Sequence, residues 1–111
     1  MRIAIPIKEK NGMNSRTEEH FGRARYFAIY DSETKQLEEV EVRKEEHGIC
    51  SPVRELLELG IDAVFVLGMG AKARALFEEN GVKVFTGNFR SVREVAENID
   101  KLESFRGGCG K

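Results

Sequence analysis

Residues 20–25, His-Phe-Gly-Arg-Ala-Arg, place two guanidinium groups and an imidazole within six positions of a 111-residue chain. Arg23 and Arg25 are two positions apart, so on an extended strand their side chains share a face. Guanidinium groups bind carboxylates and phosphates through charge-assisted hydrogen bonds. The segment therefore favours an anionic ligand. The open alternative is that the arginines pair with Glu18 and Glu19, which leaves His20 as an ordinary loop residue.

A second candidate segment, residues 62–87, predicts a strand, a glycine turn, a helix and another strand. Its two Gly-containing loops, 68–71 and 86–88, should meet at one rim, because ligands of parallel sheets bind beyond the carboxyl ends of the strands. Free N–H groups at the helix start attract anions, an effect of roughly 0.3–1 kcal/mol at an exposed position. The residues predicted to border the ligand are Gly68, Met69, Gly70, Ala71, Thr86 and Gly87. The alternative is that the first loop is a tight turn that binds no ligand.

The two cysteines, Cys50 and Cys109, are candidates for soft-metal chemistry. Cys50 lies just before an expected helix start, where a thiolate is favoured, and His47 lies three residues earlier. Cys109 lies between glycines near the end of the chain. The alternative is that both are inert thiols. Two cysteines do not by themselves make a zinc site.

Composition and missing motifs exclude several classes of function. The net charge is −1 and no segment is dominated by Lys and Arg, which argues against nucleic-acid and membrane-surface binding. The chain has no apolar run of membrane length and its start lacks a signal-peptide core, so we expect a cytoplasmic protein. Thr86-Gly87 stands where a dinucleotide site needs an acidic residue, and Lys72 is followed by Ala73 rather than the Ser or Thr of a P-loop. The first strand also lacks the acidic residue that a two-metal nuclease requires.

The hydrophobic pattern predicts an α/β fold with a five-stranded mixed sheet and helices on both faces. Strands are expected at residues 3–7, 26–31, 37–43, 63–67 and 82–86, and helices after Ser51, Gly70 and Ser91. Gly60 and Gly81 should end two helices, and Ser91 with Glu94 forms a capping-box pattern. We expect a single domain over 1–103 and a flexible, Gly-rich tail over 104–111.

Two strands carry more specific expectations. Pro6 marks either the end of strand pairing or a bulge in the first strand. In the third strand, Val40 and Val42 alternate with charged residues, which suits an exposed edge strand.

The run HFGRARYFAIYD at residues 20–31 resembles the dinitrogenase iron–molybdenum cofactor biosynthesis family. The segment VFVLGMGAKARALFEENGVKVF, residues 64–85, is similar to the second half of the same family, so the resemblance covers essentially the whole chain. It implies a ribonuclease-H-like, three-layer fold without a nuclease site. It also implies binding or carriage of iron–sulfur–molybdenum clusters or their precursors. The matching site residues are His20, Arg23, Gly68 and Gly70; the chain lacks the His-rich ending of some relatives.

Together these observations predict a carrier or storage protein for an anionic iron–sulfur–molybdenum type cluster, and not an enzyme. Candidate metal ligands are His20, Cys50 and Cys109, and the wider binding site includes Phe21, Gly22, Arg23, Arg25 and the two glycine loops. Expected partners are the cluster and cofactor-assembly proteins, with a monomer or weak homodimer and no nucleotide. One alternative is a binding module for a phosphorylated small molecule at the same rim. The other is a ligand-free interaction or regulatory domain that self-associates through the edge strand near Val40 and Val42.

Overall fold

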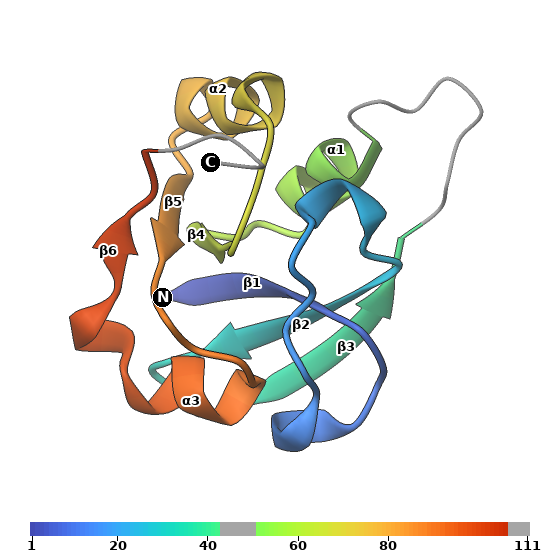
Figure 1. Ribbon diagram of the computed structural model, residues 1–111, viewed down its shortest axis with the longest axis vertical. Coiled ribbons are helices and arrows are strands. Elements are labelled where there is room, and N and C mark those ends of the chain that lie inside the picture. The colour runs from blue at the N-terminus through green and yellow to red at the C-terminus, as the bar shows by residue number, and fades with distance from the viewer. Residues whose placement is uncertain (43–50, 107–111) are drawn as a thin grey trace.

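The computed structural model describes residues 1–42 and 51–106, with Ser51 described by its backbone alone. Within these residues the chain forms an open sheet of six strands and three α-helices (Figure 1). The strands are β1 (Arg2–Ile7), β2 (Tyr26–Asp31), β3 (Leu37–Glu41), β4 (Ala63–Phe65), β5 (Lys83–Thr86) and β6 (Glu103–Ser104), and the helices are α1 (Ser51–Glu58), α2 (Ala71–Glu79) and α3 (Val92–Glu97). The strand order is β3-β2-β1-β4-β5-β6, with β1, β4 and β5 parallel to one another.

The prediction of five strands is wrong because β6 adds a sixth. This two-residue strand pairs antiparallel to β5, and the Phe105 N–H then donates to the Val84 carbonyl at 2.9 Å. Two exposed polar residues carry no hydrophobic periodicity, so the strand has no local signal in the sequence. Ordered structure thus reaches into the expected tail as far as residue 106, while Cys109 lies outside the described residues.

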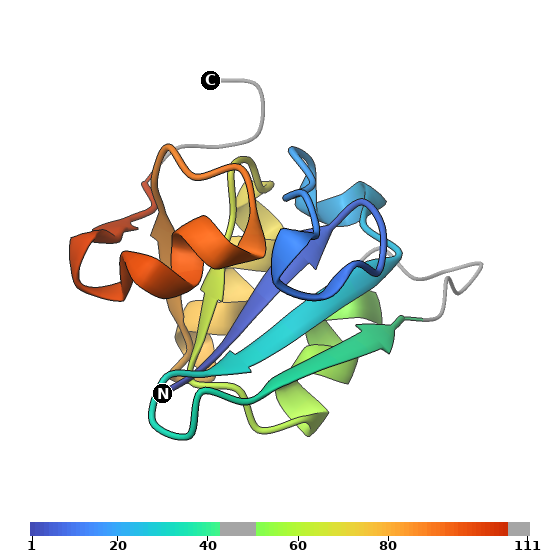
Figure 2. The same cartoon turned by 90° about the horizontal axis from the view of Figure 1, so that it is seen from below.

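The alternation of buried side chains along the strands separates two hydrophobic clusters, one on each face of the sheet. On one face, Ala4, Ile29 and Val64 pack with Leu56 of α1 and Phe77 of α2. The opposite cluster joins strand residues to α3 and comprises Ile3, Ile5, Ile7, Ala28, Tyr30, Ala63, Phe65, Val92 and Val95. Helices α1 and α2 therefore contribute to the cluster on one face and α3 to the cluster on the other (Figure 2).

Pro6 lies where β1 separates from β4. Pairing between β1 and β4 covers only Ile3 with Ala63 and Ala4 with Val64, whereas pairing with β2 continues through Ile7. Pairing with β4 thus stops at Ala4, before Pro6, and pairing with β2 runs through Pro6. This separation leaves room beside the end of β1 for another segment of chain.

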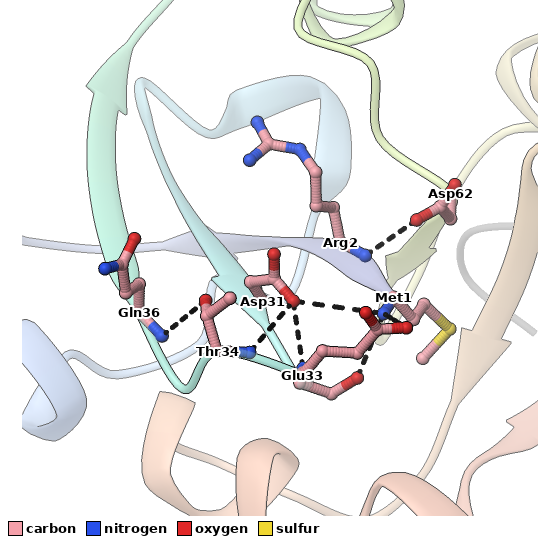
Figure 3. Close-up of polar contacts among 8 residues, drawn as sticks. Met1, Arg2, Asp31, Glu33, Thr34, Gln36 and Asp62 are labelled. Atoms are coloured by element: carbon pink, nitrogen blue, oxygen red, sulfur yellow. Dashed lines mark hydrogen bonds and ion pairs between the residues drawn. The ribbon is translucent and has the colours of Figure 1, made fainter.

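At the amino end of β1, the chain terminus contacts the turn that follows β2 (Figure 3). The Met1 ammonium lies 3.1 Å from Ser32 Oγ, 3.7 Å from Glu33 Oε2 and 4.0 Å from Asp31 Oδ1. Asp31 Oδ1 also accepts the Glu33 N–H at 2.9 Å, and this bond is the main reason why the pKa of Asp31 is lowered. The predicted turn after β2 is thus built on Asp31, at the end of β1 remote from its carboxyl end.

The edge position of β3 is confirmed, but Val42 does not lie on the exposed edge. The strand ends at Glu41, and Val42 is 4% exposed within the cluster that faces α1 and α2. Val40 is half-buried and packs against the same cluster. Substituting Val42 by Lys would therefore damage the core and cannot serve as a test of self-association.

Replacing Gly81 by Ala is expected to lower the free energy of unfolding by about 1 kcal/mol, measured by urea denaturation. Gly81 follows α2 with a φ of +77°, and a Cβ there would meet nothing within 4 Å, so the loss comes from backbone strain alone. Gly22→Ala is the matched control, because Gly22 has equally open space and no positive φ. Equal stabilities of the two variants would contradict this explanation.

Candidate functional site

The segments that follow β1, β4 and β5 lie along one edge of the molecule (Figure 2). A cleft of about 480 Å³ opens at this edge. It is lined by Glu19, His20, Leu67, Gly68, Thr86, Gly87, Asn88, Arg90 and Glu103. The structure thus brings His20, Gly68, Thr86 and Gly87 together, as the sequence predicts.

Phe21 holds the 20–23 turn in the core and thereby places His20 in the cleft. Its ring packs edge-on against Phe27 at 5.4 Å and Phe77 at 5.6 Å, and the residue is 3% exposed. Its N–H donates to the Gly68 carbonyl at 3.1 Å, which joins the turn directly to the loop after β4. The expectation that the Phe21 side chain contacts a ligand is corrected here, because that side chain is a core anchor.

The side chain of Met69, which the sequence also predicts to border the ligand, is likewise part of the core. It is 1% exposed and belongs to the core cluster that contains Phe77, so its sulfur is directed away from solvent. Gly70 and Ala71 are exposed at the start of α2, where Gly70 is the N-cap and supplies no side-chain acceptor for the first helical N–H groups. Gly68, two residues earlier, is the member of this turn that lines the cleft.

The arginine that lines the cleft is not one of the two that the sequence singled out. Gly22, Arg23 and Arg25 are exposed and are not among the lining residues. Arg90, which the sequence analysis missed, does line the cleft. Its only local signal is its position before Ser91, and that signal indicates a helix cap rather than a ligand site.

The capping interactions of α3 fix Arg90. The Ser91 hydroxyl accepts the Glu94 N–H at 3.2 Å, as the sequence predicts. The Glu94 carboxylate reaches back to the N–H of Arg90 at 2.7 Å, one residue before the expected capping-box partner. The helix cap therefore also holds the backbone of a cleft residue.

Gly87 allows the loop after β5 to turn closely. A Cβ at this position would lie 2.6 Å from Cε2 of the Phe89 ring. That ring in turn packs against Phe65 with a centroid distance of 6.4 Å. The glycine in this loop therefore has a packing role in addition to its position in the cleft.

The charges of the cleft are mixed. Glu19 and Glu103 contribute carboxylates and Arg90 a guanidinium. Lys8 Nζ lies 3.0 Å from Glu19 Oε1, and this hydrogen bond is the main cause of the lowered pKa of Glu19, with a smaller contribution from the charge of Arg90. Lys8 thus compensates Glu19, and Arg90 is the residue among those lining the cleft that contributes a guanidinium.

No group of three or more His, Cys, Asp or Glu side chains in residues 1–42 and 51–106 is arranged to hold a metal ion. Of the candidate metal ligands, His20 lies in the cleft, while Cys50 and Cys109 lie outside the described residues, as does His47. None of the helices in the described part of the chain is long and apolar enough to span a membrane.

The sheet order and the cleft at the carboxyl ends of its parallel strands define a small α/β domain with one well-formed rim. The chain belongs to the dinitrogenase iron-molybdenum cofactor family, whose sequence profile matches residues 1–102. The resemblance found at residues 20–31 and 64–85 is thereby confirmed.

Individual proteins are similar to this chain over most of its length. An uncharacterized protein of Methanocaldococcus jannaschii is 31% identical, over 95% of this chain and 92% of its own. The crystal structure of the protein PH0822 superposes with a TM-score of 0.80 at 31% identity, over 95% of this chain and 96% of the other. The apo form of the orange protein from Desulfovibrio gigas shares the fold, with a TM-score of 0.84 at 23% identity over 99% and 96% of the two chains.

Proposed function

We propose that this protein binds and carries an anionic iron–sulfur–molybdenum type cluster, or a precursor of one, during cofactor assembly or storage. The observation that supports the proposal most is the cleft in which His20, Arg90 and the backbone of two glycine loops converge, in a chain of this family. We place the protein in the cytoplasm, as a non-catalytic member with a ribonuclease-H-like, three-layer arrangement.

The lining chemistry suits a cargo that must be released. A guanidinium offers directional hydrogen bonds to sulfide or oxide groups of an anionic cluster, and an imidazole is a common metal ligand. Glycines at positions 68 and 87 leave the cleft wall without side chains at two points. A few such contacts allow reversible binding more readily than a closed set of four thiolates. Cys50 and Cys109 remain proposed additional ligands.

A phosphorylated small molecule is the second candidate, because Arg90 and the glycine loops would also suit a phosphate group. The two candidates differ in their need for a metal ligand. Binding of a phosphate compound should depend on Arg90 and be indifferent to Cys50→Ser.

Replacing His20 by Ala is expected to weaken binding of isolated iron–molybdenum cofactor by about tenfold or more, or about 1.4 kcal/mol, because the cluster loses a proposed imidazole ligand. An anaerobic titration of the purified apo protein, followed by absorption, measures the dissociation constant. Gln36→Ala is the matched control, because Gln36 is exposed at the other end of the sheet. Unchanged affinity in His20→Ala would count against His20 as a ligand. Saturable binding of inorganic phosphate together with no binding of the cofactor would favour the second candidate.

A further inference from the structure

The segment 15–18 fills the space beside the end of β1 that β4 leaves. The Lys8 N–H donates to the Arg16 carbonyl and the Glu18 N–H to the Pro6 carbonyl, both at 2.8 Å, and Ile7 and Thr17 form an antiparallel bridge. Since β2 occupies the other side of β1 as far as Ile7, this segment lies on the side of β4. Part of the long loop after β1 is therefore an extra length of paired chain.

The same segment is bonded on its other side to the chain around Arg90. The Thr17 N–H donates to the Arg90 carbonyl at 3.0 Å, and the Thr17 hydroxyl donates to the Phe89 carbonyl at 3.3 Å. The Val92 N–H donates to the Ser15 carbonyl at 3.0 Å. Thr17 thus holds two consecutive carbonyls at the point where the chain enters the cleft.

Burial shows that these contacts are part of the folded interior. Among the described residues, Ser15 and Thr17 are the buried polar side chains, at 0% and 3% exposure. Buried hydroxyls require hydrogen-bond partners, and the Phe89 carbonyl meets this need for Thr17. The Ser15 hydroxyl accepts the Asn11 N–H at 2.7 Å. The segment is therefore fixed at both of its buried positions.

The segment is also tied to β3. The Glu39 carboxylate of that strand accepts the Gly12 N–H at 2.7 Å and lies 3.4 Å from the Ser15 hydroxyl. The 8–19 loop is consequently held by β1, by β3 and by the 89–92 segment. It forms a support between the sheet and the cleft.

We infer that Thr17 is a positioning residue for Arg90, an inference that rests on the proposed function in taking Arg90 as a cargo contact. Thr17 fixes the carbonyls of residues 89 and 90, and Glu94 fixes the N–H of Arg90 at 2.7 Å. Because the backbone of Arg90 is held on both sides, its side chain extends from a fixed Cα position. The backbone around Arg90 is ordered during folding, so ligand binding does not bear the entropic cost of ordering it.

The first test needs no cargo and compares Thr17→Val with Thr17→Ser. Valine keeps the shape and the backbone N–H and removes the hydroxyl, whereas serine restores it. In native-state amide hydrogen exchange, Thr17→Val should raise the rates of Arg90 and Val92 by about fivefold or more relative to the core amide of Val64, and Thr17→Ser should return them to within about twofold of wild type. Rates that rise equally at Val64 and Arg90, or do not rise at all, would overturn the inference.

The second test is a double-mutant cycle with Arg90→Ala, with isolated iron–molybdenum cofactor as the probe. Thr17→Val should weaken binding about fivefold when Arg90 is present and less than about twofold when it is absent. Equal losses in both backgrounds would show that Thr17 does not act through Arg90. If the wild-type protein does not bind the probe, the proposed function fails, and the exchange experiment still decides the role of Thr17.

Discussion

Phe21→Ala is expected to lower the free energy of unfolding by about 3–5 kcal/mol, a large part of the 5–15 kcal/mol typical of a domain. The ring is 3% exposed and packs against Phe27 and Phe77, so its removal leaves a cavity between β2 and α2. The same substitution loosens the 20–23 turn and should also weaken cargo binding, because His20 is held in the cleft by its neighbour.

Urea denaturation monitored by circular dichroism measures this effect. Leu59→Ala is the control, since Leu59 is also a large apolar side chain but is 37% exposed and should cost less than about 1 kcal/mol. Phe21→Leu should give an intermediate loss of about 1–2 kcal/mol and keep the protein folded for binding assays. A Phe21→Ala variant as stable as Leu59→Ala would show that Phe21 is not the anchor described here.

Arg90→Glu is expected to weaken binding of isolated iron–molybdenum cofactor by about one hundredfold or more, because it removes a charge-assisted contact and adds a repulsive carboxylate. The new carboxylate would join Glu19 and Glu103 in the cleft lining. Anaerobic titration at two salt concentrations measures both the loss and its screening by salt.

Charge reversals elsewhere separate a local effect from net charge. Arg54→Glu on α1 changes the net charge equally, at an exposed residue that is not among those lining the cleft, and should alter affinity by less than about threefold. Arg23→Glu and Arg25→Glu test the sequence-based expectation that these two arginines hold the cargo. A loss at Arg23 or Arg25 that exceeds the loss at Arg90 would contradict the placement of the cargo in the cleft.

Much of the fold follows from local pattern. Apolar runs and alternation predict β1 to β5 and the two faces of β2, since each strand must bury one or both faces. The predicted helix ends at Gly60 and Gly81, where φ is positive, and the predicted cap at Ser91 also agree with the structure, because each depends on a few neighbouring residues. The rim follows from the topology of parallel strands.

The missed features depend on pairing between distant residues. The segment around Thr17 bonds to the backbone carbonyls of Phe89 and Arg90, about seventy positions away, and such backbone contacts leave no hydrophobic pattern in the sequence. β6 escapes prediction for the same reason. The sequence therefore locates the cleft through its glycines but misses Arg90, and the two arginines that it singles out are not among the lining residues.

The sequence assigns Met69 and Phe21 to the ligand site, but the structure places both side chains in the core. Their position inside a glycine turn and a motif made them candidates for ligand contact, yet both side chains are buried. Residues in a functional motif often support the contact residue beside them, and the motif alone does not separate the two roles.

The most direct test of the proposed carrier function is a map of backbone amide shifts during anaerobic titration of the apo protein with isolated iron–molybdenum cofactor. The proposed site predicts shifts or line broadening at Glu19, His20, Gly68, Gly87 and Arg90, with the remote turn at Asp31 unaffected. Shifts centred on Asp31 and Gln36 at the other end of the sheet, or none at a severalfold excess of cofactor, would contradict it.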